Sequence, residues 1–383
     1  MKSKPLLIGI KILIFIFLLT FVVSSAALDI QGKITSRLEL EEENSEIPLT
    51  RNQLELEFSS YSPRSGMAKA VVAVDDMDKN LILKKVYGEF YLDETDVKIG
   101  KQRIVWGKTD GLNPTDNFNP EDMTRPFVDD NKIAIPAVRA KHYYQDWIFD
   151  VVWAPRFEAP KFARAGERWS VIPRGIIDPI IPEAKIENSE FGIRVSHWTP
   201  AIDISYSYFR GYSKDPYFPS QPVERNGEYV WHLKFYRINV LGGDFAKDFG
   251  SFVVRGEGAY FQPEASFKSK KPYYKVVLGC DSDLTDKLYG NIQYYREKEE
   301  DKKEVQMITL ATEYEITAFK KLELNTVYNL DKNDYVFNPV YAADIMDGVS
   351  LSIGGYIFAG DKGTQFGTFA ERDYGYIELE KAF

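Results

Sequence analysis

A polar stretch holds the side chains best suited to bind a ligand. Residues 110–122 read DGLNPTDNFNPED, with Asn-Pro repeated among acids. Carboxylate and amide oxygens are the ligands of calcium, which takes about six to eight of them. The spacing is not that of an EF-hand, and Asn or Asp beside Pro is ordinary turn chemistry. We therefore predict a structural loop and no metal site, although the following residues offer suitable oxygens: Asp110, Asn113, Asp116, Asn117, Asn119, Glu121 and Asp122.

The residues before this loop carry cations that could attract anionic solutes. Residues 97–107, VKIGKQRIVWG, read as a strand that bears Lys98, Lys101 and Arg103. Successive strand residues point to opposite faces, so these cations occur on both faces of the strand. Two interpretations stay open: solvated charges at a strand rim, or a cationic strip that lines a pore.

A second candidate site is the long interruption at residues 154–188, which is rich in proline and in cations. A structureless loop of this length is uncommon and is usually functional. Guanidinium groups recognise carboxylates and phosphates through paired hydrogen bonds. The loop could enter a pore and narrow it, or it could cover the mouth from outside. Its candidate constriction residues are Arg156, Lys161, Arg164, Arg168 and Arg174.

Residues for catalysis are sparse. The three histidines, His142, His197 and His232, lie far apart, and Ser196 points to the opposite strand face from its neighbour His197. No Gly-x-Ser-x-Gly, HExxH or Cys/His metal spacing occurs. The single Cys280 allows no internal disulfide. We expect no enzyme activity and no cofactor.

The elements that position these residues begin after residue 27. Residues 1–27 combine Lys2 and Lys4, a long apolar run and small residues, which is the layout of a secretory signal peptide. A membrane anchor is the alternative. Cleavage removes Lys2, Lys4 and Lys11 and no acid, so the formal charge changes from -9 to -12. This acidic chain lacks the basic face that nucleic-acid binding needs.

The mature chain, residues 28–383, alternates polar and apolar residues in stretches of strand length. In NQLELEFSSY, Leu54, Leu56 and Phe58 share one face, and Glu55 and Glu57 share the other. Period two is the signal of a half-buried strand. No amphipathic helix is evident. We predict one all-β domain, an antiparallel barrel of about 16 to 18 strands, with a soluble β-sandwich or propeller as the alternative.

The last strand favours the membrane barrel. In DYGYIELEKAF, Gly375, Ile377 and Leu379 share a face with Phe383. A final Phe on an amphipathic strand resembles the terminal signal of bacterial outer-membrane barrels, which the barrel-insertion machinery recognises. Lys381 departs from that signal, where an aromatic or apolar residue is usual.

Two motifs extend the resemblance. The run KIGKQRIVWG followed by an Asn-Pro loop resembles a family of porin-like outer-membrane proteins, and it is similar, more weakly, to the strand motif of alginate-export barrels. DGVSLSIGGYIFAGDKGTQFGTF looks like the penultimate strands of the same porin-like family. The resemblance covers about a fifth of the chain. It implies a barrel with a transport role and brings no substrate.

We therefore predict a porin or substrate-preferring channel in the bacterial outer membrane, open to passive diffusion of small, preferentially anionic solutes. The alternative is a non-transporting scaffold or surface-interaction barrel. A competing cation filter would use the acidic faces of Glu55, Glu57, Glu378 and Glu380. The expected partners are outer-membrane lipids, the insertion machinery and small polar solutes, with a homo-oligomer left open and nucleic acid excluded.

Overall fold

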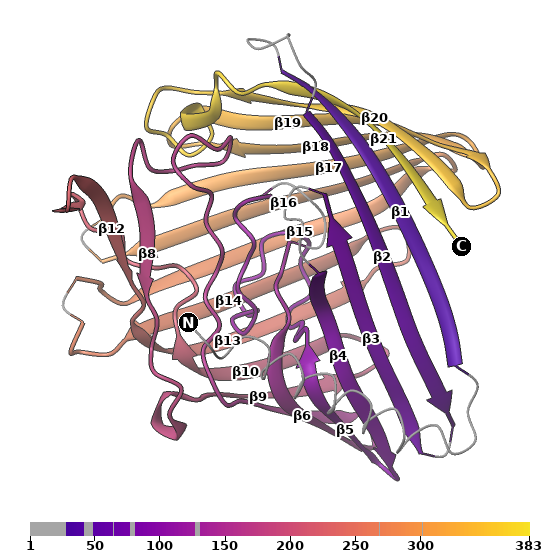
Figure 1. Ribbon diagram of the computed structural model, residues 1–383. Helices are drawn as coiled ribbons and strands as arrows, with labels where there is room; N and C mark the ends of the chain where they lie inside the picture. The colour runs from indigo at the N-terminus through magenta and orange to yellow at the C-terminus, as the bar shows by residue number, and fades with distance from the viewer. Residues whose placement is uncertain are drawn as a thin grey trace.

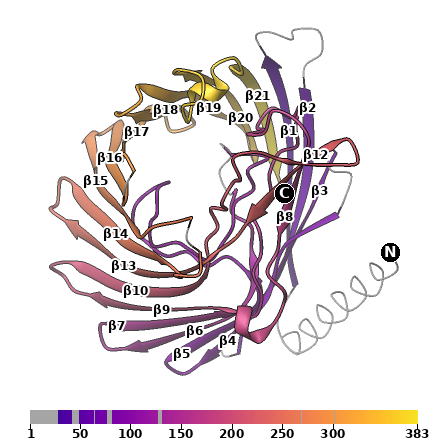
Figure 2. The ribbon, with the colours of Figure 1, turned by 90° about the vertical axis from the view of Figure 1, so that its left-hand side faces the viewer.

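The strands close into a ring (Figures 1 and 2). The computed structural model describes residues 28–41, 49–63, 65–76, 81–126, 131–267, 269–300 and 302–383. Within them an 18-stranded sheet closes where β1 (Leu28–Glu41) pairs antiparallel with both β2 (Leu49–Ser62) and β21 (Tyr374–Ala382). The prediction of an all-β antiparallel barrel of 16 to 18 strands is confirmed. The predicted signal peptide, residues 1–27, lies outside the described residues.

The remaining strands of the ring follow one another around it in chain order. They are β3 (Gly66–Asp75), β4 (Leu81–Leu92), β5 (Thr95–Gln102), β6 (Ile135–Tyr144), β7 (Trp147–Ala154), β9 (Glu190–Trp198), β10 (Asp203–Tyr212), β13 (Arg237–Asp248), β14 (Val253–Pro263), β15 (Tyr273–Thr285), β16 (Leu288–Glu299), β17 (Val305–Thr317), β18 (Lys320–Asn329), β19 (Asp334–Met346) and β20 (Val349–Ala359). Two 3₁₀ turns occur among the described residues, η1 (Ile186–Asn188) and η2 (Gly367–Phe369). No described helix is long and apolar enough to cross a membrane.

The two ends of the barrel differ in their connections. At the end that holds the C-terminus, strands are joined by short turns such as residues 93–94, 145–146 and 347–348. At the other end lie the long connections, among them 103–134 and 155–189. We call these the turn end and the loop end. Short turns at one end and long loops at the other are typical of outer-membrane barrels.

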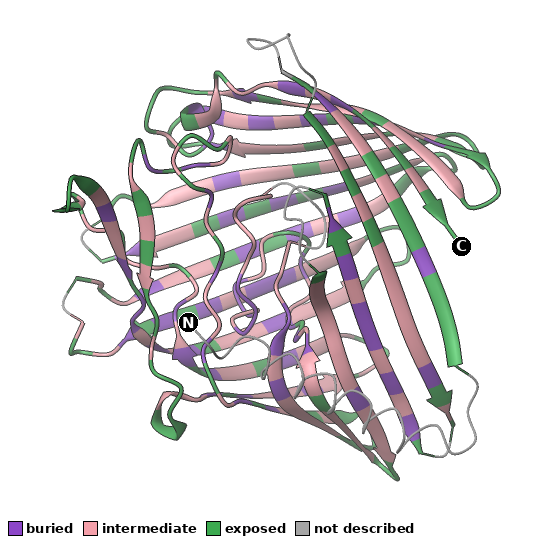
Figure 3. Cartoon of the chain, in the orientation of Figure 1, coloured by how far each residue is buried: buried purple, intermediate pink, exposed green. Residues whose placement is uncertain are grey.

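Residues of different burial alternate along many strands of the ring (Figure 3). On β1, Leu28, Ile30 and Ile34 are exposed, whereas Glu39, on the other face, binds a loop inside the barrel. On β21, Ile377 is exposed on the outward face. The core is therefore inside the ring, where loops pack on the wall, and the apolar outer face has no covering in the described chain.

A small second sheet stands at the loop end. It contains β8 (Ile176–Ile180), β11 (Val223–Arg225) and β12 (Glu228–Lys234), and β8 pairs parallel with β12. This parallel pair lies outside the antiparallel barrel. The chain passes from the small sheet to the barrel between Lys234, where β12 ends, and Arg237, where β13 begins.

The strand expected over residues 97–107 is also shorter than predicted. β5 ends at Gln102. Beyond it, the backbone N–H of Ile104 donates to Asn119 Oδ1 at 2.7 Å, so this backbone bonds to its own loop instead of a neighbouring strand. The chain leaves the wall at Arg103 and enters the barrel interior.

Candidate functional site

The connection 103–134 is called the inner loop, and its described residues, 103–126 and 131–134, fold inside the ring of strands (Figure 2). Ile104, Trp106 and Phe118 are at most 1% exposed, although they belong to a connection between strands. The Trp106 and Phe118 rings pack edge to face with centroids 5.2 Å apart, and Phe118 packs on Phe209 of β10 at 4.9 Å. The apolar residues of the loop thus build a core against the inner wall.

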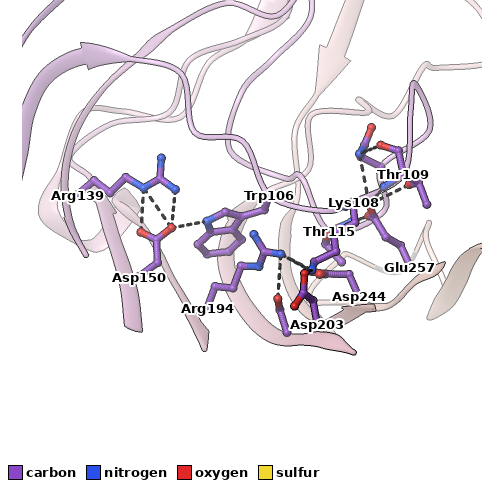
Figure 4. Close-up of polar contacts among 12 residues, drawn as sticks. Trp106, Lys108, Thr109, Thr115, Arg139, Asp150, Arg194, Asp203, Asp244 and Glu257 are labelled. Carbon is purple, nitrogen blue, oxygen red and sulfur yellow. Dashed lines mark hydrogen bonds and ion pairs between the residues drawn. The ribbon is translucent and has the colours of Figure 1, made fainter. Parts of the chain in front are cut away.

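Glu257 of β14 anchors the inner loop (Figure 4). Its Oε1 accepts hydrogen bonds from the backbone N–H groups of Lys108 and Thr109 at 2.5 and 2.7 Å, and from Thr109 Oγ1 at 2.8 Å. Its Oε2 accepts a hydrogen bond from Thr115 Oγ1 at 3.0 Å. Gly107 has φ of 98°, and a Cβ there would collide with this carboxylate. One buried acid therefore holds one end of the loop through several neutral donors.

Asp150 of β7 forms the second anchor (Figure 4). Its Oδ2 accepts a hydrogen bond from Trp106 Nε1 at 3.0 Å, and its Oδ1 accepts one from Arg139 Nε of β6 at 2.8 Å. Asp150 is 4% exposed, so its charge is balanced by the neighbouring guanidinium away from bulk water. The Trp106 indole is therefore held by ring packing on Phe118 and by the hydrogen bond from its N–H to Asp150.

A third set of contacts follows the same side of the wall. Arg194 of β9 binds Asp244 of β13 with Nη2 2.8 Å from each carboxylate oxygen, and it also donates to Ser205 at 3.0 Å. Lys108 Nζ lies 3.3 Å from Asp203 Oδ2 (Figure 4). We call the wall from β6 to β14 the anchored half, because the inner loop covers it.

Residues 155–189, the long loop, also contact the inner loop. Lys161 Nζ lies 3.1 Å from Asp122 Oδ2, and backbone hydrogen bonds join Met123 N to Lys161 O at 2.9 Å and Lys161 N to Glu121 O at 3.1 Å. Arg168 Nη1 then reaches Glu39 of β1 at 2.5 Å, far around the ring from the strands that the long loop connects. The long loop therefore enters the barrel at the loop end.

The other predicted pore residues have separate positions. Lys98 lies on the inner wall, where its Nζ is 2.9 Å from Glu89 Oε2. Lys101 lies on the opposite face of β5 and donates to Leu83 O at 2.6 Å. Arg103 begins the inner loop, and burial lowers the pKa of its guanidinium. Arg156 pairs with Glu158 at 2.5 Å on the exposed part of the long loop.

Two further arginines of the long loop stay at its surface. Arg164 is exposed, and its backbone N–H donates to Glu167 Oε2 at 2.7 Å. Arg174 stacks on the Tyr229 ring of β12, with the guanidinium carbon 3.8 Å from the ring centroid. Among the described residues, Lys161 contacts the inner loop and Arg168 contacts the wall.

The possible calcium ligands of the inner loop serve structural contacts. Asp110 Oδ2 lies 3.2 Å from Arg255 Nη1, and Asp116 Oδ2 lies 2.6 Å from Lys132 Nζ. Burial raises the pKa of Asp116 and that of Glu121. Within the described residues, no group of three or more His, Cys, Asp or Glu side chains is arranged to hold a metal ion.

The histidines lie in unrelated surroundings. His197 stacks on Trp147 with ring centroids 4.2 Å apart, His142 Nδ1 is 3.0 Å from Thr95 Oγ1, and His232 Nδ1 is 3.3 Å from Asp178 Oδ2. The three imidazoles therefore contact an indole ring, a hydroxyl and a carboxylate, each in a different part of the fold.

On the wall opposite the anchored half several charges are accessible, although Arg37 and Glu39 of β1 are largely buried. Lys321 of β18 lies between Glu313 and Glu323 at 2.8 and 2.7 Å, and its side chain is 41% exposed although it points inward. Lys33 of β1 pairs with Glu380 of β21 at 3.0 Å and is 46% exposed. We call the strands that carry accessible charges, β17, β18, β21, β1 and β2, the open half; β19 and β20, which lie between β18 and β21, are not included.

The acidic filter predicted from the sequence lies on this open half, in ion pairs. Glu378 lies 3.2 Å from Arg37, and Glu55 lies 2.5 Å from Lys84 of β4. Glu57 pairs with Lys69 of β3. Each of these acids therefore has a cation beside it, so charges of both signs alternate on this part of the wall.

The anchoring residues Glu257, Asp150 and Asp244 were missed by sequence reasoning. Their signal is faint: Glu257 lies between two glycines in RGEGA, and Asp150 is the one acid in WIFDVVWA. Burying a charged side chain costs free energy unless the charge is paired. A lone acid among small or apolar residues is therefore a candidate for a buried ion pair or hydrogen bond.

Comparisons with known proteins agree with this fold. The family described as "Protein of unknown function (DUF1302)" matches residues 86–302. The structure of Pseudomonas aeruginosa OccK3 (OpdO) superposes with a TM-score of 0.59 at 10% identity, over 93% of this chain and 95% of that chain. OmpT of Vibrio cholerae gives 0.49 at 9% identity over 94% and 98%, and a double mutant of the Rh. blastica porin gives 0.47 at 12% over 93% and 100%. No curated protein sequence matches the chain.

Proposed function

The chain belongs to the family described as "Protein of unknown function (DUF1302)", and we propose from its geometry that it is a passive diffusion channel of the bacterial outer membrane. Solutes would be small and polar. Two inward loops would set the size limit, and charges near them would set a preference for anions. The porin-like barrel shared with OccK3 supports the fold on which this proposal rests.

One observation carries the proposal, namely the unequal covering of the inner wall. The inner loop buries the charges of the anchored half, with Asp244 and Glu257 at 4% and 3% exposure. The inward charges of the open half, such as Lys321 and Lys33, keep more than a third of their side-chain surface accessible. Charged side chains inside a barrel need water or a partner, so this half supports a wet passage.

The anion preference is proposed from the loops. A narrow constriction determines selectivity more strongly than the mean charge of a pore. The acids Glu55 and Glu378 of the open half are each paired with a cation. At the wall of β1 to β3 the loops bring Arg125 and Arg168 to Asp75 and Glu39, each of which already lies beside a strand arginine, so cations outnumber acids there. The field at the narrowest part would therefore favour anions.

Insertion would depend on the C-terminal strand. Phe383 is 62% exposed on the outer face, and its backbone exchanges two hydrogen bonds with Gly32 of β1, at 2.8 and 2.9 Å. The terminal residue thus completes the seam at which the ring closes. We propose that the insertion machinery recognises this strand and that lipids surround the apolar outer face.

The experiment is a planar-bilayer recording of the purified mature protein across a salt gradient. We expect steady conductance steps and a reversal potential that indicates anion preference. Cation preference would assign the filter to Glu55, Glu57, Glu378 and Glu380. No conductance, with insertion shown by heat-modifiable gel mobility, would contradict the channel and favour a scaffold barrel.

The scaffold alternative has one specific observation in its favour. The two loops are joined to each other by backbone hydrogen bonds between residues 121–123 and Lys161 inside the barrel. A plug fastened in this way could close the passage permanently. The same bilayer recording separates the two functions.

A further inference from the structure

Four arginines gather where the two loops meet the wall of β1 and β2. Arg37 comes from β1, Arg51 from β2, Arg125 from the inner loop and Arg168 from the long loop. Arg37 and Arg168 share Glu39, with nitrogen–oxygen distances of 3.0 and 2.5 Å. These residues come from four separate segments, so only the folded barrel brings them together.

The second pair shares another carboxylate. Arg51 Nε lies 4.0 Å from Asp75 of β3, and Arg125 donates to the same carboxylate. Arg37 is directly opposite Arg51 in the pairing of β1 with β2. Like charges directly opposite on neighbouring strands are destabilising, so stability alone gives little reason for this arrangement.

Aromatic rings hold two of the guanidinium groups in place. The Arg37 guanidinium lies 3.7 Å from the centroid of the Tyr376 ring, and that of Arg168 lies 4.3 Å from the centroid of the Tyr374 ring. Stacking fixes a guanidinium plane while leaving its edge available for hydrogen bonds. The rings therefore orient donors instead of neutralising them.

The cluster remains accessible to small ions. The side chains of Arg37, Arg51, Arg125 and Arg168 are 14%, 21%, 23% and 11% exposed. At this exposure the guanidinium groups are only partly hydrated. A solute inside the barrel can still contact them. Partial desolvation strengthens charge-assisted hydrogen bonds.

We propose that these four residues form a binding site for small organic carboxylates on their way through the barrel. Glu39 and Asp75 already show that the guanidinium groups are arranged for carboxylate partners, and a solute carboxylate would bind at the accessible part of the same guanidinium groups while these two acids stay in place. The inference deepens the proposed channel function by naming its solute class. It also explains why the anion preference arises at the loops.

The test measures block by succinate. Single-channel current of the mature protein is recorded in potassium chloride while succinate is added, with inorganic phosphate as the second oxyanion. Succinate should block the wild-type current. In Arg125→Gln and Arg168→Gln the half-blocking concentration should rise roughly tenfold, because each loses a charge-assisted hydrogen-bond partner.

The matched control is Lys33→Gln, which removes the same charge from β1 outside the cluster. Its half-blocking concentration should stay within about twofold of wild type, because its ion pair with Glu380 is solvent-screened. Arg168→Lys keeps the charge but loses the planar guanidinium group, so its half-blocking concentration should lie between those of wild type and Arg168→Gln. A rise in half-blocking concentration in Lys33→Gln equal to that in Arg125→Gln and Arg168→Gln would overturn the site. It would show that succinate responds to the total charge of the pore and not to this cluster.

Calorimetric titration of succinate into the detergent-solubilised protein separates binding from conduction. If wild type releases heat on binding and Arg125→Gln does not, the site is supported even when no current flows. The missing current would then contradict the channel function but not the binding site. Normal current steps on which succinate has no effect would overturn the binding site but leave the channel function standing. Block by phosphate at lower concentrations than by succinate would overturn the assignment to carboxylates.

Discussion

The two halves of the inner wall use charge in opposite ways. On the anchored half, Glu257 and Asp150 are buried and each is surrounded by donors of the inner loop or a neighbouring strand. On the open half, Glu313 and Glu380 form ion pairs whose members keep about a third or more of their side-chain surface exposed. A buried charge needs a complete set of partners, whereas an accessible one is solvated and screened. The first half therefore holds the inner loop, and the accessible part of the second is left for solutes.

The largest expected effect is on stability. Asp150→Ala leaves the Arg139 guanidinium and the Trp106 N–H without their shared acceptor in a buried site. Removing one member of a buried ion pair costs about 3–5 kcal/mol. Unfolding in denaturant should show this loss. Glu313→Ala on the open half is the matched control and should cost less than about 1 kcal/mol. Equal losses would erase the distinction between the two halves.

A smaller effect is expected at the other anchor. Glu257→Gln keeps the size of the side chain but replaces a charged acceptor by a neutral amide, which weakens its hydrogen bonds to Lys108, Thr109 and Thr115. We expect a loss of about 2 kcal/mol. Current noise in bilayers should rise as the inner loop loosens. A quiet, equally stable variant would show that Glu257 does not hold the loop.

Deletion of residues 158–172 tests the long loop. The deletion removes Lys161, which joins the inner loop, and Arg168, which joins β1. Conductance should increase by about twofold or less, because the inner loop, which remains, is the other constriction. Proper insertion is checked by heat-modifiable mobility. Unchanged conductance would mean that the long loop only covers the mouth.

The smallest effect is expected from reversing the sign of one accessible charge. Lys321→Glu places a third acid beside Glu313 and Glu323. The reversal potential should move towards cation preference by a few millivolts, while stability changes by less than about 1 kcal/mol. The control is Ser205→Ala on the anchored half, which should leave the reversal potential unchanged.

The barrel could be predicted because its determinants are local. Leu54, Leu56 and Phe58 alternate with Glu55 and Glu57, and a period of two is sufficient to assign faces. The outward face of Phe383 followed from the same alternation. These features depend on neighbours in the chain and need no knowledge of the opposite wall.

The arrangement of the loops could not be predicted because their contacts cross the barrel. Glu257 lies far along the chain from Lys108, and nothing within the loop identifies its acceptor. The sequence left open whether residues 154–188 narrow the pore or cover its mouth, and it predicted only a structural loop for the Asn-Pro segment, whereas the structure holds that segment against the inner wall. Likewise β5 ends at Gln102 because Ile104 bonds to Asn119, a contact that depends on the folded loop.

The most direct test of the two-halves account uses cysteine accessibility during bilayer recording. The native Cys280 is first replaced by Ser, and then Lys321→Cys or Ser205→Cys is introduced; Lys321 lies on the open half, and Ser205, 1% exposed, lies on the anchored half. A charged thiol reagent added to the bath should reduce the current through the Lys321→Cys channel and leave the Ser205→Cys channel unchanged. Modification of the Ser205→Cys channel alone would contradict the account, because solutes would then pass along the half that we assign to anchoring.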